Sequence, residues 1–79
     1  MNLLDAENGK WMRVVRVEGG KTLQNRLTQY GLYPGDCLRV LREAPLGGPL
    51  LVEINGREIA IGRGVAQKIF IEDDKCDSL

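Results

Sequence analysis

The chain has 79 residues, 43% of them hydrophobic and 28% charged, and no net charge, which is the balance of one small globular domain. No stretch approaches the roughly 18 consecutive apolar residues that cross a bilayer, and residues 1–5 have neither the basic start nor the apolar stretch of a signal peptide. We therefore expect a cytoplasmic protein with no direct membrane insertion.

The charges are unevenly distributed along the chain. Between residues 10 and 71, ten lysines and arginines stand against five acidic residues, an excess of five positive charges. Residues 1–9 contain two acidic and no basic residues, and residues 72–79 contain four acidic residues and one lysine. A basic body with acidic ends suits an acidic partner surface, and the alternative is ordinary scatter of solvated charge.

The first predicted elements are a strand and a helix. Residues 11–17 are rich in β-branched side chains and are followed by two glycines close together, which favours a strand. A helix is predicted over residues 22–30, because Leu23, Leu27 and Tyr30 recur on one face. We expect this apolar stripe to pack onto the sheet.

Both ends of this helix carry capping signals. The hydroxyl of Thr22 is suited to accept a hydrogen bond from an unpaired backbone N–H, so Thr22 is the predicted N-cap. Gly31 suits the left-handed position after the helix, and Leu32 is expected to fold back onto the last turn in a Schellman closure. Pro34 prevents the helix from continuing.

The rest of the chain predicts four strands separated by turns. Residues 37–42 form the second strand, and residues 44–49 (APLGGP) form a loop because prolines and glycines interrupt a ladder. A turn over residues 62–66 leads to a last strand over residues 68–71. We expect residues 73–79 to be a disordered acidic tail.

The third and fourth strands flank Asn55-Gly56, the pair preferred in two-residue hairpin turns. In that register Val52 faces Ile59 and Leu50 faces Ile61, which gives one continuous apolar strip. Five short strands with one helix inserted after the first predict a mainly β fold, a small curved barrel over residues 1–72. Closing such a sheet removes its exposed edges, and the helix is expected to plug one end.

The sequence lacks the side chains that common active sites need. It contains no histidine, and its one serine, Ser78, lies in the tail, so a serine nucleophile has no base. Cys37 and Cys76 are expected to be free thiols in a reducing compartment, with Cys37 acting as a small strand hydrophobe. The carboxylates of the strands stand singly and no CxxC is present. We predict no catalytic residue, no cofactor and no metal site, and hence no enzyme.

Four segments stand in an order that resembles the FeoA family. They are Arg26-Leu27, then Tyr30-Gly31-Leu32 with Pro34-Gly35, then residues 44–49, and finally residues 59–66 leading into Ile69. The resemblance extends from about residue 3 to residue 71. It implies an SH3-like β-barrel with a helical insertion. It also implies a non-enzymatic cytosolic accessory protein of ferrous iron uptake, which binds the cytosolic part of the FeoB transporter.

Two turns, residues 32–34 and residues 45–49, are more apolar than their positions require. Exposed apolar groups on rigid turns are typical contact anchors, and the alternative is that Leu46 folds under its own loop and caps the barrel. Nearby arginines could add contacts to an acidic partner. The predicted partner-binding residues are Arg26, Tyr33, Pro34, Arg42, Pro45, Leu46 and Pro49, with Leu46, Tyr33 and Arg26 on or near one surface.

A small β-barrel that binds nucleic acid is the alternative function. The basic body supports it, and Trp11, Tyr30 and Tyr33 could stack on bases, but stacking platforms usually place aromatics on strands within a basic groove. We therefore expect no nucleic acid as a partner. A binder of proline-rich peptides ranks last, because such grooves are lined by several aromatics. Whether the protein forms a weak homo-oligomer is left open by the sequence.

Overall fold

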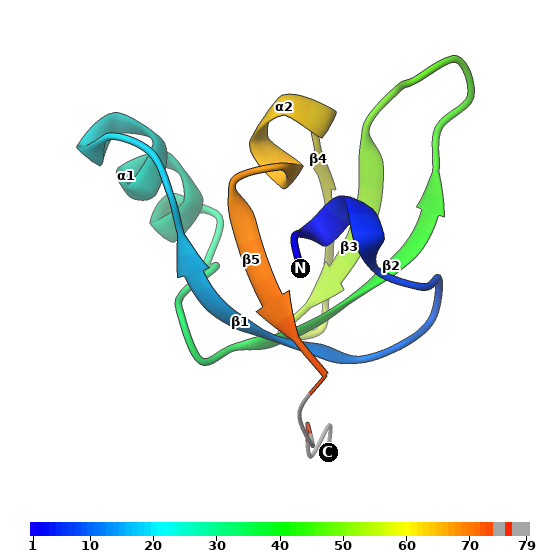
Figure 1. Ribbon diagram of the computed structural model, residues 1–79, viewed down its shortest axis with the longest axis horizontal. Helices are drawn as coiled ribbons and strands as arrows, with labels where there is room; N and C mark the ends of the chain where they lie inside the picture. The colour runs from blue at the N-terminus through cyan, green and yellow to red at the C-terminus, as the bar shows by residue number, and fades with distance from the viewer. Residues whose placement is uncertain (74–75, 77–79) are drawn as a thin grey trace.

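The computed structural model describes residues 1–73 and residue 76, so most of the predicted disordered tail, residues 73–79, lies outside the described residues. The predicted helix and strands are present with bounds that differ by at most one residue (Figure 1). The elements are η1 (Leu3–Asp5), β1 (Met12–Val17), α1 (Lys21–Gln29), β2 (Cys37–Glu43), β3 (Leu50–Ile54), β4 (Arg57–Ile61), α2 (Arg63–Ala66) and β5 (Ile69–Glu72).

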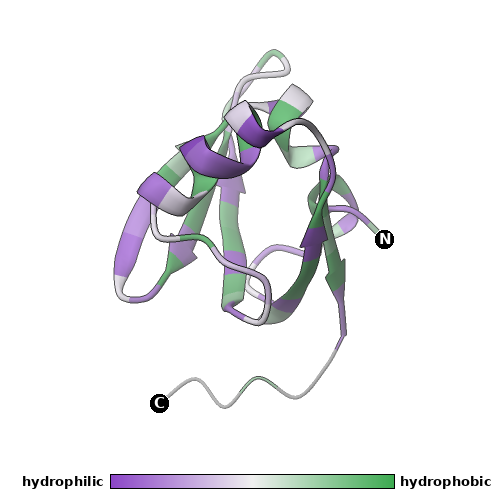
Figure 2. Cartoon of the chain, turned by 90° about the vertical axis from the view of Figure 1, so that its left-hand side faces the viewer, coloured by the Kyte–Doolittle hydropathy of each residue, from purple (hydrophilic) through white to green (hydrophobic). Residues whose placement is uncertain are grey.

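The five strands form one antiparallel sheet in the order β4-β3-β2-β1-β5, which curls around its buried face (Figure 1). The register shifts between Val14 and Arg16 in β1 and between Val40 and Arg42 in β2, and such irregularities bend strands. Hydrophobic and hydrophilic residues alternate along the strands (Figure 2). One face of the curled sheet therefore lines the core, as the sequence predicted.

The barrel is open, whereas closure was expected. Within the described part of the chain, β4 and β5 are the two edges of the sheet and do not pair with each other. The N-terminal residues instead pair with β5: Asn2 forms a bridge with Phe70, and Ile71 N–H donates to the carbonyl of Met1 at 2.9 Å. The short helix α2, predicted only as a turn, connects the two edges. Closure fails because the chain's own start occupies that side of β5.

The β3–β4 hairpin confirms the predicted register. Asn55 and Gly56 have φ angles of 52° and 77°, the left-handed conformation that a type I′ turn requires at both positions. Val52 faces Ile59 and Leu50 faces Ile61. The inward residues of β3 and Ile61 of β4 are buried.

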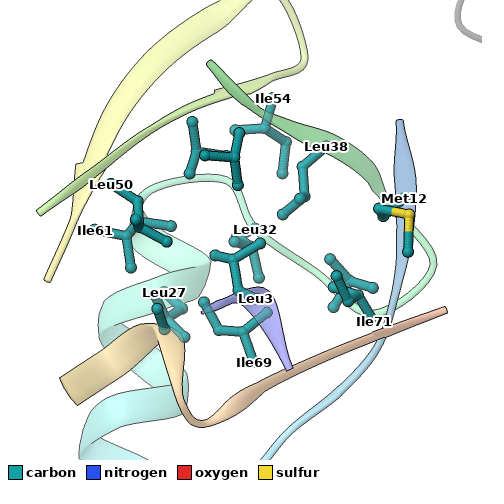
Figure 3. Close-up of a cluster of buried hydrophobic side chains, with 14 residues drawn as sticks. Leu3, Met12, Leu27, Leu32, Leu38, Leu50, Ile54, Ile61, Ile69 and Ile71 are labelled. Atoms are coloured by element: carbon teal, nitrogen blue, oxygen red, sulfur yellow. The ribbon is translucent and has the colours of Figure 1, made fainter. Parts of the chain in front are cut away.

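The core lies inside the curl of the sheet (Figure 3). Its buried members are Leu3, Met12, Val14, Leu27, Leu32, Leu38, Val40, Leu50, Val52, Ile54, Ile61, Ala66, Ile69 and Ile71. No polar side chain is buried in the part of the chain that the structure describes. The short helix η1 was not predicted; in it Asn2 and Asp5 form a capping box, and Leu3 is buried in the core.

Helix α1 confirms one capping prediction and contradicts the other. Gly31 has a φ of 84°, its N–H donates to Thr28 O at 2.9 Å, and Leu32 N–H donates to Leu27 O at 3.0 Å. These bonds are the Schellman closure that the sequence predicted. At the start of the helix the prediction of Thr22 was wrong, because the helix begins at Lys21 and Gly20 is its N-cap without a side-chain bond.

Tyr30 does not continue the buried stripe of α1. It is the C-cap residue, and its side chain is 44% exposed. The stripe ends with Leu27, and the next buried apolar residue along the chain is Leu32. The prediction for Tyr30 failed because it continued the helical repeat one residue beyond Gln29, the last residue of α1.

The two cysteines are joined, which corrects the prediction of two free thiols. Cys37 and Cys76 form a disulfide with Cα atoms 5.9 Å apart. β1 lies between β2 and β5, so Cys37 and Glu72 both pair with Arg13, from opposite sides. Two strand spacings amount to about 10 Å, and the four residues from Glu72 to Cys76 can span that distance.

Candidate partner-binding site

The loop between β2 and β3 projects from one end of the molecule (Figure 2). Ala44 N–H donates to Pro49 O at 2.9 Å, and Gly48 N–H donates to Pro45 O at 3.2 Å. These bonds make the loop a compact turn. Leu46 stands at its tip and is fully exposed. The alternative in which Leu46 folds under the loop and caps the barrel is therefore wrong.

Leu46 adopts a backbone conformation that is unusual for leucine. Its φ is 61°, and that of Gly47 is 71°, so the tip is a type I′ turn, in which glycine, asparagine and aspartate are favoured. The left-handed region costs an ordinary residue about 1–2 kcal/mol. A fully exposed leucine gains no burial in return within the free chain. Folding of the free chain explains neither its conformation nor its exposure, and the contact role of Leu46 stays a prediction from the sequence.

Charged residues lie beside this loop. Arg42 is exposed near the end of β2. Glu43, the last residue of β2, pairs with Arg63 of α2, with Oε2 and Nη1 3.7 Å apart. Arg26 lines a cleft of about 110 Å³ between α1 and the β4–α2 connection, together with Gly62 and other residues. α2 and the β2–β3 loop lie at the same end of the molecule, and α1 lies on the other side of α2 from the loop (Figure 1).

We call this end the rim surface. It comprises Arg26, Arg42, Pro45, Leu46, Pro49 and Arg63. Arg63 was missed in the sequence because residues 62–66 were assigned only to a tight turn. Its pairing with Glu43 depends on the path of α2 across the end of the barrel, for which the sequence offers no local signal.

Tyr33 and Pro34 lie at the opposite end of β2. They precede Cys37, whereas the loop with Leu46 follows Glu43, and a strand of this length measures roughly 20 Å. Tyr33 is 51% exposed, in a turn in which its N–H donates to the Asp36 carboxylate at 3.0 Å. The structure does not bring Tyr33 and Leu46 together. The roles of Tyr33 and Pro34 in binding stay predictions from the sequence.

A second cleft, of about 190 Å³, separates α1 from β1. It is lined by Arg16, Val17, Gln24, Leu27, Thr28, Leu32 and Pro34. Leu27 also lines the cleft on the other side of the helix, and it is the buried residue of α1. The position of α1, and with it that of Arg26, therefore depends strongly on Leu27.

No metal site is formed by the described residues. Among residues 1–73 and 76, no three histidines, cysteines or carboxylates gather closely enough to hold an ion. The chain has no histidine, and several of its described carboxylates are engaged in separate ion pairs, such as Glu53 with Arg39 and Glu18 with Arg16. The absence of tight ferrous iron binding stays a prediction.

The helices of the described chain are short. α1 is the longest, with nine residues, and none reaches the length and apolarity that a membrane span needs.

Comparison with known proteins identifies the family. Residues 1–73 match the FeoA domain family. The "Putative Fe(2+) transport protein A" of Methanocaldococcus jannaschii is 37% identical over 68 residues, which cover 86% of this chain and 80% of that protein. The solution structure of iron(II) transport protein A from Clostridium thermocellum has a TM-score of 0.87 at 30% identity and covers 92% of this chain, which spans 45% of that one.

Other solved structures extend the likeness. FeoA from Chlorobium tepidum has a TM-score of 0.86 at 33% identity and covers 99% of this chain and 74% of its own. FeoA of Stenotrophomonas maltophilia, solved with zinc and described as a prokaryotic SH3 domain protein, shares the fold with a TM-score of 0.76 at 22% identity, covering 91% and 89% of the two chains. The predicted SH3-like fold is thereby confirmed, as an open barrel. The chain belongs to the FeoA family.

Proposed function

We propose that this protein is a non-enzymatic, cytosolic accessory protein of ferrous iron uptake, and that it acts by binding the cytosolic part of the FeoB transporter through the rim surface. Membership of the FeoA family and the names of its relatives, which are Fe(2+) transport proteins, support the link to iron uptake. A chain without histidine favours action by contact over catalysis.

The observation that carries the proposal is Leu46. A single exposed leucine is ordinary on a protein surface, but this one also holds a left-handed backbone at the tip of a loop between Pro45 and Pro49. The prolines limit the conformational freedom of the loop, so less entropy is lost when it docks. Arg42 near the end of β2 and Arg26 on α1 offer positive charge to an acidic partner.

Replacing Leu46 by aspartate should abolish binding without disturbing the fold. A charge placed in the centre of a contact is left desolvated and unpaired, and we expect affinity for the isolated FeoB cytosolic domain to fall at least about tenfold. The melting temperature should stay within about 2 °C of wild type, because the side chain is exposed and aspartate tolerates a positive φ better than leucine. Calorimetric titration and circular dichroism of the same sample measure both.

Val15→Asp is the matched control. Val15 is an apolar residue that is 41% exposed on β1 and lies outside the rim surface, so this variant adds the same charge elsewhere. It should bind with an affinity within about threefold of wild type. Full binding by a folded Leu46→Asp protein would remove the loop from the contact, and equal loss in both variants would show that added charge alone prevents association.

A further inference from the structure

The arginines of the chain differ in whether the fold itself satisfies them. Outside the rim surface, each arginine donates a hydrogen bond to a group of the same chain: Arg13 to the carbonyl of Gly35, Arg16 to Glu18, Arg39 to Glu53 and Arg57 to the carbonyl of Tyr30. On the rim surface, the guanidinium groups of Arg26 and Arg42 form no ion pair or hydrogen bond with any residue that the structure describes. Arg63, the third arginine of this surface, has a partner in Glu43.

The ion pair between Arg63 and Glu43 is loose. Nη1 of Arg63 and Oε2 of Glu43 are 3.7 Å apart, and the two side chains are 40% and 49% exposed. A charge-assisted hydrogen bond measures about 2.7–2.9 Å, so this pair is an electrostatic contact without a hydrogen bond. The pair of Arg39 with Glu53 is tighter, with 2.6 Å between Nη2 and Oε1, and less exposed. Exposed ion pairs contribute little stability, and Arg63 can therefore change its partner at little cost.

Glu43 places a carboxylate beside the loop that carries Leu46. It is the last residue of β2 and lies opposite Leu50, and the next residue, Ala44, closes the loop through its bond to the carbonyl of Pro49. Glu43 thus already meets an arginine of the rim surface in the free chain. An acidic partner that reaches Arg63 must compete with Glu43 for it and is repelled by the charge of Glu43.

We propose that Glu43 is an internal substitute for a carboxylate of the partner: it holds Arg63 in the free chain, and a carboxylate of the bound partner displaces it. The inference rests on the proposed function, in which an acidic partner occupies the rim surface. In the exchange Arg63 leaves a loose contact for a bidentate one, because a guanidinium presents two parallel N–H groups to a free carboxylate.

The exchange makes the rim surface selective among acidic partners. A partner with a carboxylate opposite Arg63 replaces the contact that it disrupts. A partner whose carboxylates lie elsewhere leaves Arg63 on Glu43 and is still repelled by Glu43. Glu43 therefore lowers the affinity for every acidic partner, but lowers it least for one that engages Arg63.

Titration with hexaglutamate tests the exchange without the transporter. The full, isotope-labelled chain is titrated with this peptide at about 20 mM salt, at which exposed charges are weakly screened, and the Nε–Hε signals of its arginines are followed by NMR. We expect the signals of Arg26, Arg42 and Arg63 to shift, and those of Arg16 and Arg39, which the chain's own carboxylates hold, to stay in place. An unchanged Arg63 signal at the end of the titration would overturn the exchange.

Glu43→Gln removes the internal carboxylate with almost no change in shape. We expect its affinity for hexaglutamate to be about threefold higher than that of wild type, because the peptide no longer competes with Glu43. In an Arg63→Gln background the same change should raise the affinity by less than about 1.5-fold. Glu58→Gln is the matched control. Glu58 is exposed on β4, outside the rim surface, and the loss of its charge should also raise the affinity by less than about 1.5-fold.

The outcomes separate the exchange from the proposed function. All variants should melt within about 2 °C of wild type, because none of the changed side chains is buried. A gain from Glu43→Gln no larger than that from Glu58→Gln, or an equal gain with and without Arg63, would overturn the exchange. These measurements do not involve FeoB. A chain that shows the exchange with hexaglutamate but fails to bind the FeoB cytosolic domain would support the exchange and disprove the proposed function.

Discussion

Leu27→Ala should leave the protein partly or largely unfolded at 37 °C. Leu27 is 2% exposed and is the buried residue of α1, and truncating such a leucine costs about 2–5 kcal/mol. A domain of 79 residues has a free energy of unfolding of about 4–12 kcal/mol in total. In a reducing buffer, thermal unfolding followed by circular dichroism should show a melting temperature lower by about 10 °C or more.

Leu23→Ala is the control for this experiment. It makes the same chemical change on the same helix, but Leu23 is only partly buried, so the loss should be about 1–2 kcal/mol. Clefts lie on both sides of α1. Few other side chains of the helix therefore contact the sheet and could compensate for the loss of Leu27. A melting temperature of Leu27→Ala within about 2 °C of wild type would show that α1 is not packed on the sheet.

Gly31→Ala should destabilise the protein by about 2–3 kcal/mol, through two separate costs. The φ of Gly31 is 84°, which strains any residue with a Cβ. The added methyl group would also collide with the guanidinium of Arg57, which donates a hydrogen bond to the carbonyl of Tyr30 at the end of α1. Moving Arg57 away removes that cap and the favourable charge at the helix C-terminus.

Two comparisons separate these costs. Gly35 has a φ of 95°, but nothing lies within 4 Å of the position of its Cβ, so Gly35→Ala reports backbone strain alone, about 1–2 kcal/mol. In an Arg57→Ala background, Gly31→Ala should cost no more than Gly35→Ala does. Chemical denaturation of the four variants provides the measurement. Equal losses for Gly31→Ala and Gly35→Ala in the wild-type background would mean that Arg57 does not cap α1.

Local signals explain what could be predicted of the fold. Asn55 and Gly56, which are adjacent in the chain, determine the type of turn between β3 and β4. The pairing of Val52 with Ile59 follows from that turn. Gly31 followed by Leu32 is likewise a signal within one helical turn. Each of these predictions was confirmed because the interactions that decide it lie within a few residues.

Contacts between distant parts of the chain explain what was missed. Leu3 is buried because η1 lies beside β5 and α2, and the open barrel results from the pairing of Asn2 with Phe70. The disulfide between Cys37 and Cys76 depends on β1 lying between their strands. Composition and spacing contain no information about these neighbours, so free thiols and a closed sheet were the reasonable expectations.

The candidate site was predicted in part. The sequence indicated the apolar loop around Leu46 but left two possibilities, exposure and capping, because a leucine between prolines and glycines has no periodicity to place it. Its positive φ and full exposure came from the structure. Tyr33 was grouped with Leu46 from composition alone, and the length of β2 separates them.

Calorimetric titration of the wild-type chain with the isolated FeoB cytosolic domain tests the central claim most directly. The same protein is titrated with an arbitrary single-stranded oligonucleotide, each at about 50 and 300 mM salt. We predict a saturable complex with the transporter domain at both salt concentrations and no saturable binding of the oligonucleotide. The account would be contradicted if the folded chain failed to bind the transporter domain and instead bound the oligonucleotide with an affinity that falls steeply with salt.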